Sequence, residues 1–461
     1  MHGWGGGQQV WVEDFCEADT QHVHLLLAPV GGHATGIFSE IAVRMPGREE
    51  PLYRWHFNAP IRATAIHHPE YRAALAMLCR VFMVDGILVS SLIGHALDVL
   101  DTPLPTLHVC HEYYPFCPAF YIRYQGICQR CDDARLKDCL SNNPASSLFS
   151  HVSGATWSAI RQAYLRLIAA KPIRLLAPSE SVARYYRQLQ PAIAEHGITV
   201  IPHGMDWLPA GAVAVTRPAG SLPRIVILGR LYEAKGKALL DELLPRICTA
   251  AEVVLLGCGY GGREYDGLPN VILVPSYERT ALPALLAEYR PDLGLLLSVV
   301  PETFSYTLSE LMHAGIPALA PRLGSFVDRI VDGENGFLAE PTVEAMSARL
   351  EQLLAERSAL TRVAGHLRAY RGSTRAEMVA AYLPLLPSRA MHAGFQPGSR
   401  WLPTLAETAP LEAQMGELDA AQCKQAALPR PNHLRGRLIA KLSAILIRIV
   451  YRLQRMAAGR S

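Results

Sequence analysis

The sequence lacks the features that define several other classes of protein. No apolar run approaches the eighteen or more residues that a membrane-spanning helix needs. Met1 is followed by glycine-rich sequence rather than by a basic and then apolar stretch, so no secretory signal is recognisable. The net charge is only +3, which is too small to indicate nucleic-acid binding. Together these absences predict a cytoplasmic protein without a nucleic-acid partner.

Cysteine is too sparse for a disulfide-stabilised scaffold, since only ten cysteines occur in 461 residues. The length instead predicts two or three domains with sizeable cores. Half of the residues are hydrophobic, as is ordinary for a globular α/β enzyme. Short apolar runs typical of buried parallel strands alternate with segments of helical spacing along most of the chain, whereas residues 40–65 show only weak patterning.

The most informative stretch is the loop and helix that follow a predicted strand over 293–297. Glu302 lies in the loop and Glu310 on the first turns of a helix predicted over 306–314, which Gly315 ends. Both carboxylates can therefore face one crevice at the carboxyl end of a strand, where α/β sheets bind ligands. Carboxylates suit sugar hydroxyls, and free amides at a helix start suit a phosphate; the amides here belong to Phe304, Ser305 and Tyr306.

This stretch resembles the donor-binding motif of the retaining GT-B glycosyltransferases of family 4 (glycosyltransferase group 1). Seven residues separate the two glutamates, and a Gly-x-Pro and a Gly-Phe-Leu sequence follow in the same order and spacing, up to Pro341. The resemblance implies an α/β fold of the GT-B type, with two Rossmann-like domains facing a cleft. It also implies transfer of a sugar from a nucleotide diphosphate sugar with retention and with no cofactor. Glu302 would hold donor sugar hydroxyls, and Glu310 the nucleoside ribose.

A second candidate site follows the strand predicted over 224–228. Gly229 and Arg230 end this strand, and Lys235 lies five residues further on, before a helix. Fixed cations at a strand end beside a helix start suit a diphosphate. The resemblance assigns Arg230 and Lys235 to the donor phosphates, where they would stabilise the charge on the leaving diphosphate. A Gly-x-Gly turn at Gly257 resembles the turn near the nucleotide base.

His111 is the candidate from the first half of the chain, because it follows a strand predicted over 106–110. In the glycosyltransferase resemblance, a His-Asp or His-Glu pair follows this strand and faces the donor sugar across the cleft. Aspartate is the commoner second member, so Glu112 departs from the pattern. The turn that begins at Pro202 and His203 resembles the turn that leads into the interdomain linker. Ser179 is either a helix N-cap or, as the resemblance implies for its Pro-Ser turn, part of the lining of the cleft.

Five of the ten cysteines fall between Cys110 and Cys139. Cys128 and Cys131 have the two-residue gap of a zinc knuckle, and Cys117 and Cys139 could complete four thiolate ligands. The insertion resembles that of a subgroup of bacterial glycosyltransferases. A structural zinc, free or redox-active thiols, and disulfides all stay open, whereas no histidine or carboxylate set indicates a catalytic metal.

The two ends of the chain carry further expectations. Gly5 and Gly6 belong to a glycine-rich loop that opens a predicted helix and suits a donor ligand, but no strand precedes it. We expect either a truncated start or a flexible terminus. Residues 433–457 have one apolar and one basic face, which favours docking on an anionic membrane surface over packing on the enzyme or a partner.

The predicted organisation has five segments. They are an N-terminal acceptor-side domain (1–206) with a Cys-rich insertion (110–140), a linker (207–222), a nucleotide-sugar domain with a return helix (223–387), a second linker (388–432) and the basic helix. The expected role is synthesis of bacterial surface polysaccharide or lipopolysaccharide, with a saccharide or lipid-linked saccharide as acceptor, on the cytoplasmic side of the membrane. The rivals are a nucleotide-sugar epimerase, a phosphorylase and a catalytically impaired nucleotide-sugar-binding protein.

Overall fold

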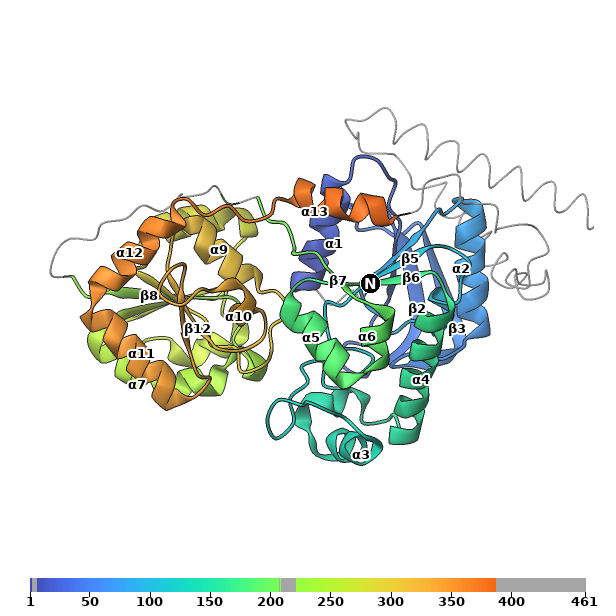
Figure 1. Ribbon diagram of the computed structural model, residues 1–461, viewed down its shortest axis with the longest axis horizontal. Coiled ribbons are helices and arrows are strands. Elements are labelled where there is room, and N and C mark those ends of the chain that lie inside the picture. Colours follow the sequence, from blue (N-terminus) through green and yellow to red (C-terminus); the bar gives the residue numbers. More distant parts are fainter. Residues whose placement is uncertain (2–5, 207, 209–220, 387–461) are drawn as a thin grey trace, which may run out of the picture.

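The computed structural model describes residues 1, 6–206, 208 and 221–386 (Figure 1). These residues form two α/β regions, which we call the N region (6–206) and the C region (221–367), each built around a parallel sheet. Gly5, the basic helix predicted over 433–457 and the linker before it lie outside the described residues, as does most of the first linker.

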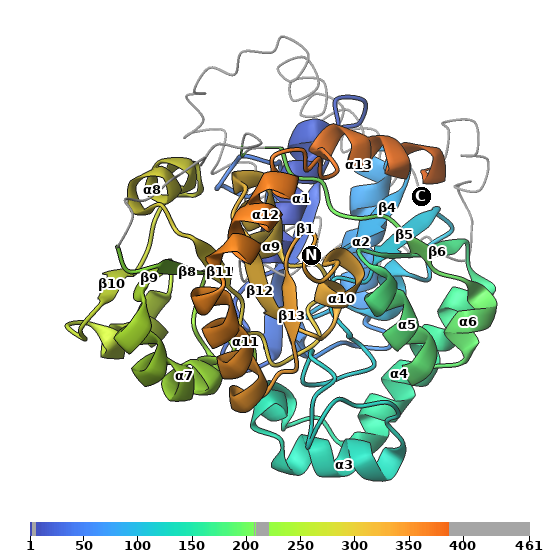
Figure 2. The same ribbon diagram turned by 60° about the vertical axis from the view of Figure 1, so that its left-hand side comes forward.

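The C region contains one sheet of six parallel strands in the order β10-β9-β8-β11-β12-β13 (Figure 2). Nearly every residue of the four central strands is buried, which explains their continuous apolar runs. The strands are β8 (Arg224–Leu228), β9 (Glu252–Leu256), β10 (Val271–Val274), β11 (Leu293–Leu295), β12 (Ala318–Pro321) and β13 (Phe337–Ala339).

Helices pack closely on this sheet. Helix α9 (Tyr306–Ala314) lies so near β11 that a Cβ at Gly294 would collide with the Leu311 side chain. Glycine at this position therefore permits the close helix–strand contact. The other helices of the C region are α7 (Lys237–Ala250), α8 (Leu282–Tyr289), α10 (Ser325–Arg329), α11 (Val343–Ala355) and α12 (Arg357–Leu367).

The N region has two sheets rather than one. Strands β4 (Ile87–Val89), β5 (Thr106–Val109), β6 (Ile173–Ala177) and β7 (Thr199–Val200) form a parallel sheet in sequence order. Three further strands form an antiparallel sheet: β1 (Leu26–Pro29), β2 (Ile37–Arg44) and β3 (Tyr53–Arg62).

Strands β2 and β3 are an addition to the sequence-based prediction, which found no clear element over 40–65. Their buried residues do alternate, but the register shifts between Phe38 and Glu40, and the middle of β3 is exposed. A bulge interrupts the two-residue period on which strand prediction depends. The helical spacing of residues 94–100 also predicts a helix, but the structure has only a single 3₁₀ turn there, Leu97–Val99.

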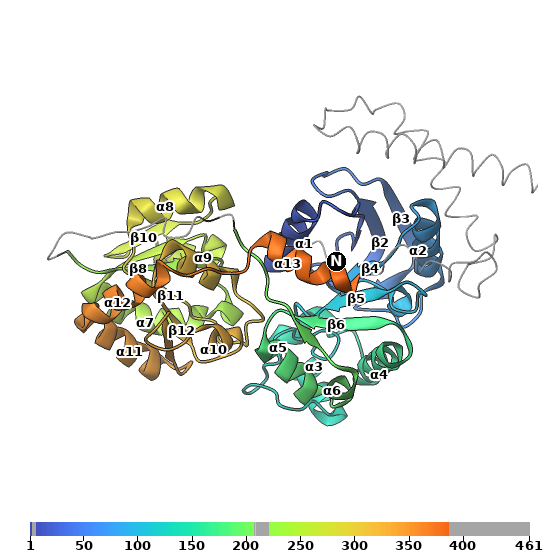
Figure 3. The same cartoon turned by 45° about the horizontal axis from the view of Figure 1, so that its top comes forward.

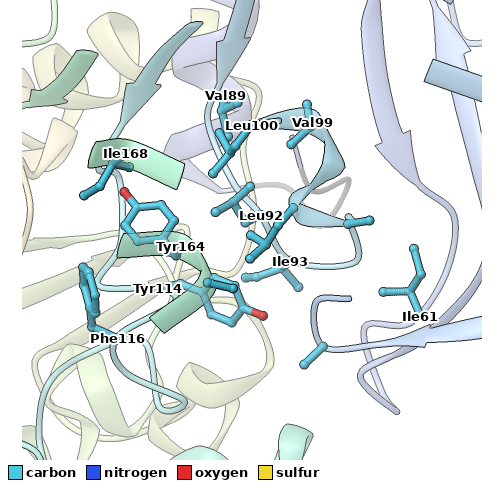
Figure 4. Packing of buried hydrophobic residues seen from close by; sticks show 14 of the residues in the cluster. Ile61, Val89, Leu92, Ile93, Val99, Leu100, Tyr114, Phe116, Tyr164 and Ile168 are labelled. Atoms are coloured by element: carbon cyan, nitrogen blue, oxygen red, sulfur yellow. The ribbon is translucent and has the colours of Figure 1, made fainter. Parts of the chain in front are cut away.

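Aromatic side chains fill the core of the N region between the parallel sheet and its helices. Figure 4 shows Tyr114, Phe116 and Tyr164 facing apolar residues such as Leu92 and Val89, and all five are buried. The helices are α1 (Gly7–Ala18), α2 (Pro69–Val81), α3 (Asp133–Asn142), α4 (Gly154–Ala170), α5 (Glu180–Leu189) and α6 (Ala192–His196).

The last described helix returns from the C region to the N region. Figures 1 and 3 show α13 (Arg375–Tyr382) lying beside α1. Trp11 of α1 is fully buried against Tyr382 and donates its indole N–H to the Met378 sulfur at 3.1 Å. A separate apolar cluster therefore ties the end of the described chain to its beginning.

Candidate functional site

The loop before α9 has the geometry predicted from the sequence. The helix begins at Tyr306, with Ser305 as its N-cap, and ends before Gly315, which has a φ of 76°. The Ser305 hydroxyl accepts a hydrogen bond from the Leu308 amide at 3.3 Å. Ser305 itself has a φ of 69°, a left-handed conformation that costs free energy outside glycine. Such strain concentrates at functional sites, which makes this loop a candidate binding element.

Glu302 is held from its backbone in the same loop. Its carbonyl accepts a hydrogen bond from the Ser325 amide at 2.8 Å, so the start of α10 lies directly on it. Gly324 has a φ of 58°, and a Cβ there would collide with the Glu302 backbone. The position of Glu302 is thus fixed by the neighbouring strand-to-helix connection, β12 to α10.

Lys235 meets Glu302 at the carboxyl edge of the sheet. The Lys235 Nζ lies 2.6 Å from Glu302 Oε1, and the side chains are 38% and 12% exposed. Lys235 reaches this place through a 3₁₀ turn after β8 that Gly236 ends with a φ of 82°. A Cβ at Gly236 would collide with the Leu297 carbonyl, so this turn is pressed against the end of β11. Neighbouring strands therefore deliver the two predicted residues to one point.

Arg230 and Gly229 lie on the same connection as Lys235. Gly229 leaves β8 with a φ of 90°, and Arg230 is exposed. The Arg230 side chain passes Gly259, where a Cβ would be 3.7 Å from its Cγ. The predicted cation and the predicted Gly-x-Gly turn thus lie side by side at the ends of β8 and β9.

Glu310 lies on α9 beyond the loop, and its side chain is half-buried. Burial raises the pKa of its carboxyl to about 7, although the Arg279 guanidinium opposes the shift. The same carboxyl acts electrostatically on the Tyr277 hydroxyl, and Tyr277 packs against Gly257. Glu310 is therefore near the ends of β9 and β10, on the side of the Gly-x-Gly turn.

His111 reaches the loop before α9 through a second histidine. The His111 and His203 rings are 5.0 Å apart, and His203 lies 4.7 Å from the Phe304 ring and 5.8 Å from Tyr306, centre to centre. Burial lowers the pKa of His203 to about 3, so its ring is neutral at physiological pH. His203 was not among the predicted site residues, although the turn that contains it stood out in the sequence.

The start of α1 also lies at this junction. Gly6 precedes the helix with a φ of 81°, and a Cβ at Gly7 would come 3.5 Å from the Tyr306 ring. Asp14, further along α1, accepts two hydrogen bonds from Arg279 at 3.1 and 2.8 Å. Glycines and charges of the N region thus contact the C region beside Glu310.

Glu112 lies away from these contacts. Its carboxylate accepts a hydrogen bond from the Ser91 hydroxyl at 2.7 Å, within the N region. Burial raises its pKa to about 7, while the Ser91 hydrogen bond opposes that shift. The residue after His111 therefore has a partner of its own in the N region.

Cys117, Cys128, Cys131 and Cys139 line one small pocket, whose water-accessible volume is about 10 Å³. All four are free, and each sulfur accepts an N–H hydrogen bond at 3.1 to 3.5 Å; the donors are Ile122, Arg135, Arg161 and Asn143. Over the described part of the chain, no three histidine, cysteine or carboxylate side chains are arranged to hold a metal ion. The zinc site therefore stays a prediction from the Cys-x-x-Cys spacing.

The match to a known protein family lies in the C region. Residues 222–356 match the model of the family "Glycosyl transferases group 1". A phosphatidyl-myo-inositol mannosyltransferase from Propionibacterium freudenreichii is 28% identical over 204 residues, which are 42% of this chain and 50% of that protein. The match thus spans about half the length of this curated relative. These findings support the resemblance to the group 1 glycosyltransferases.

Solved structures extend the likeness to both regions. Sucrose-phosphate synthase from Thermosynechococcus elongatus superposes with a TM-score of 0.50 at 15% identity, over 91% of this chain and 95% of that one. The fold is of the GT-B type. The crystal structure of Anabaena HepE in complex with UDP is similar with a TM-score of 0.47 at 17% identity, over 68% and 81% of the two chains.

Among the helices that the structure describes, none combines the length and the hydrophobicity that a membrane span requires.

Proposed function

We propose that this chain is a retaining glycosyltransferase that moves a sugar from a nucleotide diphosphate sugar to an acceptor. One observation carries the proposal: Lys235 and Glu302 form an ion pair at the carboxyl edge of the C-region sheet, where Rossmann-like folds bind nucleotides. A cation for the leaving diphosphate and a carboxylate for the sugar hydroxyls are the two groups that this reaction requires. The family match to residues 222–356 covers both of them.

The proposed roles follow from where each group lies. Arg230 and Lys235 stabilise the charge that develops on the leaving diphosphate, which is the main electrostatic demand of the transfer. In the present structure Lys235 pairs with Glu302. An incoming diphosphate would take Lys235 as its partner, and the Glu302 carboxylate would then accept hydrogen bonds from the donor sugar.

The remaining residues complete the donor site. The amides at the start of α9 would bind a phosphate, Glu310 would hold the ribose hydroxyls, and Gly229 and Gly6 would let the ligand approach the backbone. His111 would contact the sugar from the N region through the junction that it shares with His203. No side chain acts as a covalent nucleophile and no cofactor takes part in this proposal.

The test is a binding panel of UDP, GDP, ADP, CMP and TDP sugars, read by thermal shift and isothermal titration. Arg230→Ala and Glu302→Ala should weaken binding of the selected donor, whereas Lys237→Ala should not. Lys237 is a matched control because its amine pairs with Asp241 at 3.0 Å on the neighbouring surface. No binding by the folded chain would contradict the proposal. Binding without acceptor-dependent transfer would instead favour the impaired nucleotide-sugar-binding protein.

For the biological setting we propose synthesis of a bacterial surface polysaccharide or lipopolysaccharide on the cytoplasmic face of the membrane. The named relative, a phosphatidyl-myo-inositol mannosyltransferase, supports a lipid-linked acceptor. The basic and apolar faces of residues 433–457 would dock on anionic lipid. Sedimentation of the full chain with anionic but not zwitterionic vesicles, lost in an Arg448→Glu, Arg452→Glu variant, tests the docking.

We also retain the structural zinc at Cys117, Cys128, Cys131 and Cys139 as a proposal. It is supported by the knuckle spacing and by the single pocket that the four thiols share. The Arg161 guanidinium is buried and donates to the Cys131 sulfur at 3.1 Å, which would offset the charge of a thiolate. About one zinc per chain by elemental analysis, lost in Cys131→Ser, would support it; a metal-free folded chain would exclude it.

A further inference from the structure

The Cys-rich segment (residues 110–132, between β5 and α3) contacts the C region at the proposed donor site. Tyr121 lies in this segment, and its hydroxyl is close enough to the Tyr232 hydroxyl for each to shift the pKa of the other. Tyr232 belongs to the connection that carries Arg230 and Lys235. A residue of the N region thus lies directly over the proposed phosphate-binding connection.

The charges around Tyr121 are those of the proposed site. Burial raises the pKa of its hydroxyl, and both Lys235 and Glu302 act on that hydroxyl electrostatically. Since Lys235 and Glu302 pair with each other at 2.6 Å, the three groups share one locality. A phenol hydroxyl can both donate and accept a hydrogen bond, which suits a sugar hydroxyl or a phosphate oxygen.

A second tyrosine of the segment approaches the same glutamate. Tyr113 is 1% exposed, and its hydroxyl has no hydrogen-bond partner among the described residues. Its ring lies 5.8 Å from that of Tyr185, centre to centre. The neighbouring Arg184 Nη1 lies 3.9 Å from Asp328 of α10, the helix that begins on the Glu302 backbone. A buried hydroxyl without a partner is costly, because it loses its hydration and gains nothing in exchange. A ligand group between the two regions would remove this cost.

The backbone of the segment fixes Tyr121 in place. Phe120 and Ile122, on either side of it, have φ values of 64° and 46°. The Ile122 amide donates to the Cys117 sulfur at 3.3 Å, and the Ile122 carbonyl accepts from the Cys128 amide at 2.7 Å. Ile122 is fully buried. The thiol pocket therefore serves as an anchor for the tyrosine that faces the C region.

We infer that Tyr121 and Tyr113 position the sugar end of the donor, so that the Cys-rich segment supplies part of the specificity of the site. This inference rests on the proposed function of the Lys235–Glu302 site. It adds two phenol hydroxyls from the N region to the carboxylate and cations of the C region. The sugar, rather than the nucleoside, is the part that they would recognise, because Glu302, which would hold the sugar hydroxyls, is the charged neighbour that both tyrosines share.

The experiment compares two ligands on three single variants of the full chain. Tyr113→Phe, Tyr121→Phe and the control Tyr124→Phe are titrated with the nucleotide diphosphate sugar that the panel selects and with the same nucleoside diphosphate alone. Tyr124 lies in the same segment, but its hydroxyl donates to Asp138 of α3 at 2.8 Å, on the exposed side. For Tyr113→Phe and Tyr121→Phe we expect the Kd of the sugar nucleotide to rise about fivefold, as for one lost hydrogen bond. The Kd of the nucleoside diphosphate should stay unchanged.

Thermal unfolding of the same variants separates recognition from structure. Tyr113→Phe should keep or raise the Tm, since it removes a hydroxyl that has no partner among the described residues. The inference is overturned, and the proposed function is not, if Tyr113→Phe and Tyr121→Phe bind the sugar nucleotide as tightly as the wild type does while Glu302→Ala binds it more weakly. If Glu302→Ala and Arg230→Ala also bind as the wild type does, the proposed function itself fails.

Discussion

The two regions are built on parallel sheets but differ in the connections at the carboxyl ends of their strands. In the C region the connections are short, so Lys235 and Glu302 lie within a few residues of β8 and β11. In the N region the chain runs from residue 110 to residue 132 between β5 and α3 without a helix or strand. Buried thiols and left-handed residues hold that segment instead. Short connections let the strand position the side chain, whereas long ones need their own anchors.

The largest effect should come from the short connections. Lys235→Ala removes a fixed cation at the leaving diphosphate, and we expect kcat to fall about 100-fold, as for the loss of one electrostatic contact to a transition state. Lys237→Ala should retain activity within about twofold, because its partners Asp241 and Glu264 lie outside the site. The measurement is acceptor-dependent transfer at saturating donor. A similar loss of kcat in both variants would show that the transfer depends on the net positive charge of this surface and not on the position of Lys235.

The next largest effect should come from a contact between the two regions and should be a loss of stability. Asp14 of α1 is 3% exposed and pairs with Arg279 of the C region at 2.8 Å. Asp14→Asn should lower the free energy of unfolding by about 2 kcal/mol, which is less than for a fully buried pair because Arg279 can rehydrate. Glu17→Gln is the control, since Glu17 is 72% exposed and pairs only at the surface. Urea denaturation should show a clearly larger shift for Asp14→Asn; equal shifts would mean that this junction does not stabilise the fold.

The affinity for the donor should depend on pH through the Glu310 carboxyl of the C region. The Glu310 carboxyl has a raised pKa of about 7, so it is largely protonated at pH 6 and ionised at pH 8. The ionised carboxylate accepts charge-assisted hydrogen bonds from the ribose hydroxyls, which are stronger than those to the neutral carboxyl. Affinity should therefore fall as the pH drops through 7, by about tenfold at most per unit below it. Isothermal titration from pH 5.5 to 8 measures this.

Glu310→Gln provides the control for that pH series. Its amide does not titrate, so binding should become weaker overall but nearly independent of pH. Glu112 has a pKa in the same range, but it lies in the N region against Ser91. If the pH dependence persists in Glu310→Gln and disappears in Glu112→Gln, the titrating group lies in the N region. That result would contradict the proposed role of Glu310.

The smallest effect concerns a helix start in the N region. Ser179 caps α5 by accepting a hydrogen bond from the Val182 amide at 3.4 Å. Ser179→Ala should therefore cost about 1 kcal/mol of unfolding free energy and leave donor affinity unchanged. Ser150→Ala, at an exposed position, should change stability by less than about 0.5 kcal/mol. Loss of donor affinity in Ser179→Ala at normal stability would show that this turn also binds ligand.

Local sequence predicted the C region better than the N region. The bounds predicted for β8 and α9 are those of the structure, because β8 is a continuous apolar run and Gly315 marks the end of α9. The GT-B fold predicted from the donor motif is confirmed by the structure and by its likeness to a solved structure of this fold. Strands β2 and β3 were missed, since a bulge and an exposed middle disturb their alternation.

The candidate site divides in the same way. Glu302, Glu310, Arg230 and Lys235 could be proposed from the sequence, because each lies near a strand end or a helix start in a motif that resembles that of a known family. The proposed roles of Tyr113 and Tyr121 and the contact of His203 with Phe304 could not, because they depend on which surfaces of the two regions meet. Their residue types and spacing carry no signal of a partner that lies more than a hundred residues away in the chain.

The sequence by itself determined most strands and helices of the C region and the strand ends that carry the charged residues, since these depend on neighbours within a few positions. Only the tertiary structure decided that β8 lies beside β11, and hence that Lys235 meets Glu302. It also decided that the His203 ring lies against the Phe304 ring. The physical reason is that strand order and the packing of two regions depend on burial over the whole chain, which no local pattern encodes.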